Sequence, residues 1–406
     1  MVESTDNHPN ADKLKVCIVN DGNKNHTVVC GASNVQEGQT IAFATVGSVL
    51  PGNFKIKKAM IRGVESSGMI CSERELNISE EHDGIMVLPN NLSLGEDFIS
   101  SYGNKYFSLK LDITPNRSDA FSHIGVARDI SCKTNRNFKK IIPNEVLSGK
   151  KISFDIEIEN KEDCPRYIGA IVEKIKVGPS PNWLVERLKS IGQRSINNIV
   201  DISNYVLMEM GHPTHIFDFD TIKNKSIYVR RAKKGEEIIT LDDQKHKLDK
   251  THLLITDGNI PLALAGIMGG ADTAVSHNTD TILIESAYFD PVTIRKSSKN
   301  LSLITDASKR FERGADPNGC KRAFWRVLNL VSEIAGGELS SEVIDIYPDY
   351  IEKKNIKLRK SEIEIILGIK VEDSLVENIL NRLEIELKKN QKGWECKVPT
   401  FRPDIT

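Results

Sequence analysis

A glutamate inside an apolar run is the residue with the sharpest chemical meaning in this sequence. Glu285 lies in the segment ILIES, whose composition predicts a strand buried on both faces. A lone carboxylate in such a strand loses its hydration, so a partner must offset the cost of burial. Two interpretations follow: Glu285 accepts a hydrogen bond from a ligand, or it lies on an edge strand and pairs with a lysine or arginine.

Polar residues upstream could act together with this carboxylate. His215 stands in GHPTHIFDFD, where a lone histidine is either a hydrogen-bonded core residue or a functional one. Arg194 carries a forked cationic donor, which suits a substrate bearing phosphates or a carbonyl ester. Asn197 and Asn198 either contact the substrate or satisfy nearby backbone groups. A ligand-facing loop is expected to begin at Gln193 and to carry Arg194, Asn197, Asn198, Asp201 and Asn204.

The elements that must position these residues carry clear local signals. RYIGAIVEKIKVG predicts a strand, and SPNWLVERLKSIG predicts a helix with Ser180 as N-cap, Pro181 in the first helical position and Gly192 after its end. Leu184 and Leu188 share one face of that helix. The glycines of AGIMGG allow either a close backbone approach in a narrow pocket or a tight turn.

Four segments combine these residues: INNIVDISNYVLMEMGHPTHIFDFD, LALAGIMGG, ILIESAYFDP and TDASKRFERGADP. With HPNADKLKVCIVNDG near the start and LDITPNRSDAFSHIGVARDI around residue 120, they make the chain resemble the β subunit of bacterial phenylalanyl-tRNA synthetase along nearly its whole length. The four segments are similar to the editing module of that family. The resemblance implies binding of tRNA(Phe) and hydrolysis of misacylated tyrosyl-tRNA(Phe).

The same resemblance implies roles for single residues. The catalytic set is Glu285, His215 and Arg194, with Glu285 accepting a hydrogen bond from the para-hydroxyl of the misattached tyrosine. Substrate-binding roles fall on Asn197, Asn198, Gly269, Thr305 and Ala307, with Gly269 on the pocket wall and the last two residues at the floor of the aromatic side-chain site. Asp306, Lys309, Arg310 and Glu312 are expected to form structural ion pairs.

A physical limit explains why such a site is needed. A pocket shaped for phenylalanine discriminates only about a hundredfold against an analogue that adds one hydroxyl, so a second sieve is required. The ester must then be hydrolysed by a positioned water with stabilisation of the developing oxyanion, for which backbone amides near Gly269 are candidates. No GxSxG elbow marks a serine nucleophile. We therefore expect attack by water without a covalent intermediate, with His215 orienting the reactants.

The organisation predicted is an α+β multidomain chain. The expected domains are an OB-fold tRNA-binding β-barrel at 1–104, a partial linking α/β domain at 105–150, a mixed α/β editing domain of B3/B4 type at 151–346, and a small helical domain of winged-helix type at 347–406. Asp119 is a candidate cap for the linking helix. Ser361 and Glu364 are expected to form a capping box for a helix that ends at Gly368, and Leu375, Ile379 and Leu383 a second apolar stripe.

A basic segment in the first domain is the candidate tRNA contact. Its residues are Lys55, Lys57, Lys58 and Arg62 in NFKIKKAMIRG. Strand alternation places Lys55 and Lys57 on one face and Ile56 on the other. The alternative is a solvated strand edge protected by lysines. Because Phe43 and Phe54 are the only phenylalanines before residue 90, backbone or shape recognition of folded RNA is favoured over base reading.

Composition bounds the remaining classes. The 406 residues are 39% hydrophobic and 27% charged, with a formal net charge of −1, as in folded globular proteins. No run approaches the roughly 20 apolar residues that span a bilayer, and the first residues, MVESTDNHPN, lack the basic and apolar regions of a signal peptide, so cytoplasmic localisation is expected. Seven scattered cysteines without a CxxC pair favour buried thiols in a reducing compartment.

In the resembled family, Met1 falls where the barrel is about to begin, and PTFRPDIT falls where a catalytic-like domain would begin. We therefore expect a chain truncated at both ends, either an engineered fragment or a truncated gene product. Asp404 matches the first carboxylate of the family's magnesium site, which is incomplete here. Editing should need no cofactor, whereas Mg²⁺ and ATP serve the complete α2β2 synthetase with its α subunit. This chain alone should not aminoacylate.

Three functional hypotheses remain. The first is an editing esterase within a phenylalanine-tRNA ligase β subunit, and the second is a non-catalytic tRNA-binding scaffold. The third is a metal-dependent hydrolase that uses His215 with Asp218 and Asp220. Chelators would abolish only the activity of the third.

Overall fold

The structure is a computed structural model that describes residues 1–78, 82–90, 92–102, 108–148 and 152–406. The chain divides into two compact units, Met1–Phe107 and Ser108–Thr406. The domain boundaries expected at 104/105 and 150/151 lie outside the described residues. Across the described ranges, every helix is too short or too polar to cross a membrane. The seven cysteines are free thiols.

Strands dominate the first unit, as its alternating runs predict. β1, β2 and β3 form an antiparallel sheet, and the other strands pair as β4 with β11, β5 with β10, β6 with β7 and β8 with β9. The bounds are β1 Val2–Asn7, β2 Lys15–Asn20, β3 Asn25–Cys30, β4 Thr40–Ile41, β5 Phe43–Ala44, β6 Val49–Leu50, β7 Phe54–Lys55, β8 Ala59–Ile61, β9 Val64–Ser66, β10 Met69–Ile70, β11 Val87–Leu88 and, for one short helix, α1 Phe98–Tyr102. Within the described part of this unit, the ladders remain separate sheets, so the closed OB barrel stays a prediction.

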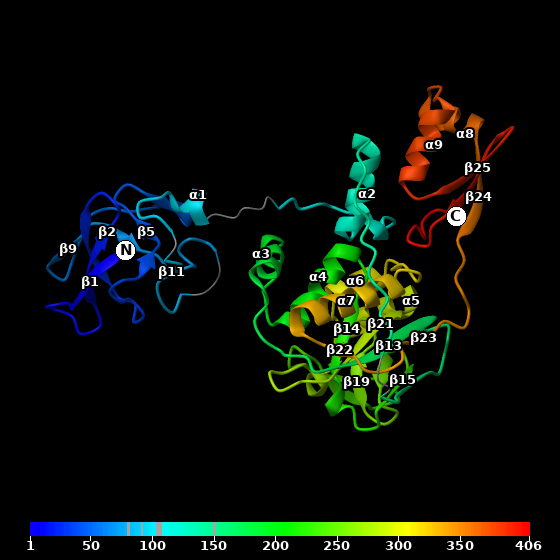
Figure 1. Ribbon diagram of the computed structural model, residues 1–406, viewed down its shortest axis with the longest axis horizontal. Helices are drawn as coiled ribbons and strands as arrows, with labels where there is room; N and C mark the ends of the chain where they lie inside the picture. The colour runs from blue at the N-terminus through cyan, green and yellow to red at the C-terminus, as the bar shows by residue number, and fades with distance from the viewer. Residues whose placement is uncertain (79–81, 91, 103–107, 149–151) are drawn as a thin grey trace. The chain divides into compact units, whose positions relative to one another are not determined.

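Two sheets form the centre of the second unit. The first sheet has the order β14–β21–β13–β22, with β23 also pairing with β13, and the second has the order β12–β15–β18–β19–β20 (Figure 1). The first sheet comprises β13 Arg166–Glu173, β14 Thr214–Asp218, β21 Ile282–Tyr288, β22 Glu338–Leu339 and β23 Ile344–Ile346. The second comprises β12 Asp155–Ile158, β15 Ser226–Arg231, β18 Leu253–Thr256, β19 Pro261–Leu264 and β20 Met268–Gly269, with a hairpin of β16 Glu237–Ile239 and β17 Lys245–Lys247 beside it.

Alternating side chains of the first sheet face two different layers. Ile168 and Ala170 of β13 pack with the helices α3, α4 and α7, whereas Tyr167 and Ile171 pack with the strands of the second sheet. The helices of this region are α3 Asn182–Ser190, α4 Asn198–Met210, α5 Pro291–Asn300, α6 Asp306–Phe311 and α7 Cys320–Ala335. The first sheet is therefore covered on both faces, which confirms the buried strand predicted for ILIES.

The predicted helix near residue 185 is present, but its start was assigned wrongly. Pro181 occupies the N-cap position, and Ser180 instead donates a hydrogen bond to Asp201 Oδ2 at 2.6 Å. Leu184 and Leu188 are buried as expected, and Gly192 follows the helix with a φ of 77°. Ser180 thus links the start of α3 to α4.

The ligand-facing loop expected after Gln193 is much shorter than predicted. From Asn198 onward the chain forms helix α4, which ends at Met210 before Gly211 in a left-handed conformation. Asn197 is its N-cap, with a side chain that accepts hydrogen bonds from Ile199 N–H and Val200 N–H. Reading asparagines and aspartates as loop residues was wrong here, because they cap and anchor a helix.

The C-terminal part is less helical than predicted. It contains a sheet in the order β24–β26–β25 together with two helices, and Trp394 is 1% exposed in their common core. The bounds are β24 Lys354–Arg359, α8 Lys360–Leu367, α9 Asp373–Arg382, β25 Glu386–Asn390 and β26 Gly393–Val398. Gly368 ends α8 as predicted, but the carboxylate that accepts from the N-cap backbone belongs to Glu362, so the capping box of Ser361 and Glu364 was wrong. Of the predicted stripe, Leu383 packs against this core, whereas Leu375 is exposed and Val376 of α9 is buried in its place.

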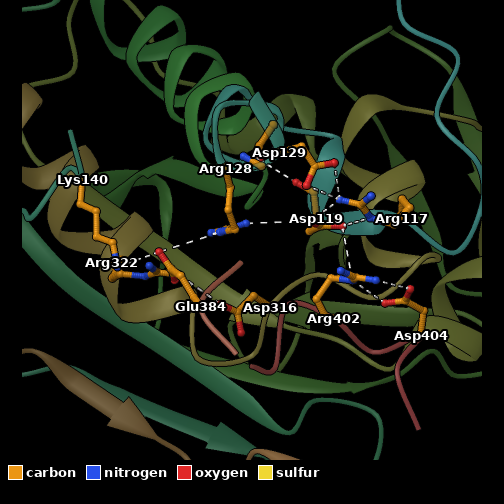
Figure 2. Close-up of polar contacts among 12 residues, drawn as sticks. Arg117, Asp119, Arg128, Asp129, Lys140, Asp316, Arg322, Glu384, Arg402 and Asp404 are labelled. Carbon is orange, nitrogen blue, oxygen red and sulfur yellow. Dashed lines mark hydrogen bonds and ion pairs between the residues drawn. The ribbon is translucent and has the colours of Figure 1, made fainter. Parts of the chain in front are cut away.

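A short helix and an ion-pair network join three segments of the second unit. Helix α2 (His123–Thr134) follows a 3₁₀ turn, Ser118–Ala120, and its cap is Ser122, which accepts from Gly125 N–H, so the predicted cap Asp119 was wrong. Figure 2 shows what Asp119 does instead. Its carboxylate accepts from Arg117 at 2.9 and 3.1 Å and lies 3.9 Å from Arg128 and 4.0 Å from Arg402.

We predict that Asp119→Asn destabilises the second unit by about 3 kcal/mol. The Asp119 side chain is 2% exposed, and its loss leaves neighbouring guanidinium groups without their shared counter-charge. Urea unfolding followed by circular dichroism measures the change. The matched control is Asp220→Asn, because Asp220 is 65% exposed in its ion pair with Lys225 and should cost less than about 1 kcal/mol. Equal losses in the two variants would refute a structural role for the network.

Candidate functional site

A buried carboxylate occupies the middle of the first sheet. Glu285 is 5% exposed and lies on β21, between β14 and β13 (Figure 1). In the antiparallel ladders it is directly opposite His215 on one side and Gly169 on the other. Because directly opposed residues point to the same face, all three face the second sheet. Glu285 therefore lies on a central strand, and the edge-strand alternative is wrong.

The recorded partner of Glu285 is a tyrosine that the sequence did not single out. Tyr167, on β13, donates a hydrogen bond from its phenolic hydroxyl to Glu285 Oε2 at 2.8 Å. Burial raises the pKa of Glu285 to about 7, and this hydrogen bond acts in the opposite direction. Tyr167 is itself fully buried, and burial raises its pKa well above the usual value. Glu285 is thus a buried acid that already accepts a hydrogen bond from the phenol of Tyr167.

His215 is fixed between an aromatic ring and a glycine. Its ring meets Phe217 edge to face, with ring centroids 4.4 Å apart. A Cβ atom added to Gly269 would lie 2.4 Å from His215 Cε1, so only a glycine fits at this position without displacing the ring. Burial lowers the pKa of His215 to about 4, which leaves the imidazole neutral near pH 7. A neutral imidazole can accept or donate one hydrogen bond at each nitrogen.

The glycine-rich segment serves both roles that the sequence left open. Gly266, with a φ of 66°, forms the turn between β19 and β20, and Gly269 provides the close approach to His215. Gly270 N–H donates to Leu262 O at 2.8 Å, so this amide is committed and does not serve as an oxyanion donor. Thr305 caps α6 and donates from Oγ1 to Ile267 O at 2.9 Å.

These contacts bring the four predicted segments together in space. α4 and β14 are joined by Ser203, which donates from Oγ to Thr214 O at 2.8 Å. Ala307 lies half-buried in the first turn of α6, beside the cap of that helix. The structural pairing predicted for this segment is confirmed for Arg310, whose guanidinium lies 3.7 Å from Asp306.

Three residues of the predicted site are less directly connected to it. Arg194 is exposed in the loop of residues 192–197, and within the described residues no recorded hydrogen bond or ion pair joins it to Glu285 or His215. Asn197 caps α4. Asn198 is buried, accepts from Gly178 N–H at 3.0 Å and donates to Lys176 O at 2.8 Å, so its amide serves the backbone. Their substrate-binding roles stay predictions.

The acidic residues do not form a metal centre in the described part of the chain, where no group of three or more His, Cys, Asp or Glu side chains is placed to hold an ion. Asp218 accepts from Thr279 Oγ1 at 2.5 Å, and Asp220 pairs with Lys225. Arg402 donates to both oxygens of Asp404, at 2.8 and 2.9 Å, and holds its pKa below the usual range.

The basic segment of the first unit has the predicted alternation. Ile56 is 4% exposed, whereas Lys55 and Lys57 on either side of it are exposed. Lys57 lines a groove of about 1040 Å³, and Phe54, which is 58% exposed, lines the same groove. Lys58 forms an ion pair with Glu65 at 2.9 Å. Arg62 is exposed at a positive φ of 47° in the turn between β8 and β9.

Comparison with known families assigns most of the chain to three domain families. Residues 1–97 match the putative tRNA binding domain, residues 163–336 the B3/4 domain, and residues 356–406 the tRNA synthetase B5 domain. A solved N-terminal fragment of the phenylalanyl-tRNA synthetase β subunit from Pyrococcus horikoshii covers 72% of this chain and 81% of its own at 18% identity, with a TM-score of 0.36.

Curated relatives match over the whole sequence. The phenylalanine–tRNA ligase β subunit of Geobacter sulfurreducens is 44% identical over 408 residues, which cover 100% of this chain and 51% of the relative. The corresponding subunit of Thermotoga maritima is 42% identical over 398 residues, which cover 98% of this chain and 50% of the relative. The chain thus spans about half the length of the curated relatives it matches. On this evidence it belongs to the phenylalanine–tRNA ligase β-subunit family.

Proposed function

We propose that this chain binds tRNA(Phe) and hydrolyses the ester of tyrosine misattached to it. The observation that carries the proposal is the contact between Tyr167 and Glu285, in which a buried carboxylate accepts a hydrogen bond from a phenol at 2.8 Å. A tyrosyl substrate offers the same donor. The site therefore has the chemistry that separates a phenol from a bare phenyl ring.

Burial makes this recognition selective. Leaving a buried acceptor without a donor costs about 1–3 kcal/mol, more for a charged group, so a phenylalanyl ester that covers Oε1 of Glu285, the oxygen that Tyr167 does not contact, would be disfavoured by that amount. A tyrosyl ester supplies the missing donor. The selection is thus opposite in sign to that of a pocket shaped for phenylalanine, which disfavours the added hydroxyl by only about a hundredfold.

Hydrolysis in this proposal is carried out by water. His215 is neutral near pH 7 and lies on the same face of the sheet as Glu285, so it can orient the ester or the attacking water by a hydrogen bond. His215 and Glu285 are directly opposite each other on the adjacent antiparallel strands β14 and β21. The structure offers them fixed positions, which is what a reaction that depends on orientation requires.

Binding of the RNA is proposed for the first unit, and assembly with an α subunit for the whole protein. The exposed lysines beside the groove of the first unit suit phosphate contacts, and residues 1–97 match a putative tRNA binding domain. Activation of phenylalanine with ATP and Mg²⁺ is proposed only for the complete enzyme with its α subunit. A scaffold that binds RNA without turnover is the competing outcome of the tests below.

Glu285→Ala is predicted to lower kcat/KM for deacylation of tyrosyl-tRNA(Phe) at least tenfold, because the hydroxyl loses its acceptor. Release of labelled tyrosine from charged tRNA measures the rate. The matched control is Glu237→Ala, which removes a partly exposed glutamate from the β16–β17 hairpin. Retained tRNA binding without turnover by the unsubstituted chain would support the scaffold instead.

Deacylation of tyrosyl-tRNA(Phe) should rise between pH 6 and 8. With a pKa of about 7, Glu285 is protonated below this range and becomes a full acceptor only above it. The catalysed rate, after subtraction of the rate without protein, should therefore show one inflection near pH 7. Glu285→Gln has no carboxyl to titrate, and an unchanged inflection in that variant would assign it to another group.

Lys55→Glu with Lys57→Glu is predicted to weaken tRNA binding by tenfold or more at low salt and to reduce the salt dependence of binding. Filter binding at several salt concentrations measures both quantities. Lys24→Glu, in the exposed turn between β2 and β3, serves as the control for charge reversal elsewhere on the unit. Equal losses at both sites would show only non-specific electrostatics.

A further inference from the structure

The contact between Tyr167 and Glu285 raises a question that phenol recognition alone does not answer. If Glu285 is to accept a hydrogen bond from a substrate hydroxyl, the hydrogen bond that it already accepts from Tyr167 must be compatible with that role. Tyr167 is fully buried in the core between the two sheets, and its hydroxyl reaches only one carboxylate oxygen, Oε2. Within the described residues, Oε1 accepts no recorded hydrogen bond.

The strand register makes this arrangement rigid. Tyr167 is opposite Ala287, and Glu285 is opposite Gly169, so the tyrosine and the glutamate are diagonal neighbours on one face. A long side chain spans such a diagonal across an antiparallel pair. Gly169 has no side chain to intervene, and Ile156 of the second sheet lies against it, 2.8 Å from where its Cβ would stand. The phenol therefore has little freedom to leave Oε2.

Few other groups can influence the carboxylate. The titratable side chains that face it are Tyr167 from β13, His215 from β14 and Cys164 from the loop before β13. Strands β18, β19 and β20 of the facing sheet carry none. Strands β12 and β15 carry charged residues, but the side chains that they contribute to the core shared with the first sheet are Ile156, Ile158, Ile227 and Val229. Burial raises the pKa of Glu285, and the hydrogen bond from Tyr167 lowers it.

We propose that Tyr167 is a positioning residue that holds Glu285 by Oε2 and leaves Oε1 as the one acceptor for the hydroxyl of the substrate. This inference rests on the proposed editing function. With Oε2 occupied, the carboxylate cannot turn both oxygens toward the substrate. A phenylalanyl ester that covers Oε1 leaves this oxygen without a donor, which is the condition for rejecting it.

Removing the phenol relaxes this condition in two ways. The carboxylate gains a second open oxygen, and it loses the hydrogen bond that favours its charged form. A protonated, reorientable carboxyl tolerates an apolar ring better than a fixed carboxylate does. Tyr167→Phe is therefore expected to lower the ratio of kcat/KM for tyrosyl over phenylalanyl ester about tenfold. It should also shift the pH inflection of Glu285 upward.

The test compares the full chain with Tyr167→Phe, and Tyr228→Phe is the matched control, since its hydroxyl on β15 donates no recorded hydrogen bond within the described residues. Deacylation of both charged tRNAs gives the selectivity. Carboxyl ¹³C NMR of glutamate-labelled protein, with the Glu285 signal assigned from Glu285→Gln, gives the titration directly. The expected result is reduced selectivity and a raised titration midpoint for Tyr167→Phe alone.

Unchanged selectivity and an unchanged midpoint in Tyr167→Phe would overturn the proposal. If the unsubstituted chain does not deacylate at all, the proposed function fails, while the NMR midpoint still decides whether Tyr167 holds the carboxylate. If Tyr167→Phe does not fold, 3-fluorotyrosine at position 167 replaces it with nearly the same volume and a more acidic phenol. That stronger donor must lower the Glu285 midpoint, and no movement would refute the contact.

Discussion

The second unit depends on one constraint, the burial of a carboxylate inside a sheet that is covered on both faces. Glu285 is 5% exposed, and the strand that carries it runs through the middle of the first sheet. A charge in such a place is tolerated only with hydrogen-bond partners and a local environment arranged for it. Tyr167 supplies the partner, and the raised pKa of Glu285 shows that burial still disfavours the charge.

Glycine makes the close contact of the two sheets possible. Side chains at Gly169 and Gly269 would collide with Ile156 and His215 of the opposite sheet. Because both positions lack a side chain, the second sheet can approach the face that bears the carboxylate. Glu285 and His215 both face this closely packed region, where the ring of His215 lies against Gly269.

Local sequence signals predicted several strands and helices correctly, but they predicted poorly which groups the polar side chains contact. The strand RYIGAIVEK, the buried strand ILIES and the helix after Pro181 were recognisable because burial patterns and turn residues are local. Helix α4 was missed because Asn197, Asn198 and Asp201 suggest a loop, while in the structure they cap the helix and bind neighbouring backbone and hydroxyl groups. The capping assignments of Asp119 and Ser361 were wrong because several polar residues near each helix start could act as the cap.

Tyr167 could not be found from the sequence, because its role depends on strand register between residues 118 positions apart. Nothing local distinguishes it from a core tyrosine. The convergence of the four segments was expected from the family resemblance. The contact network among them comes only from the fold. The C-terminal sheet was missed because its three strands are short and charged, with alternation visible only once Trp394 and Cys396 are known to point inward.

The network around Asp119 also has a consequence for the order in which the protein assembles during translation. Arg117 and Asp119 leave the ribosome early, whereas Arg402 is added near the end of this sequence. Until then, the early segment lacks part of its counter-charge, and the packing of Arg128 over Phe401, 3.8 Å from the ring centroid, cannot form. Pairing between residues so distant in sequence is slow to form. The contacts of Arg128 with Phe401 and of Asp119 with Arg402 therefore form only after these two late residues have been synthesised.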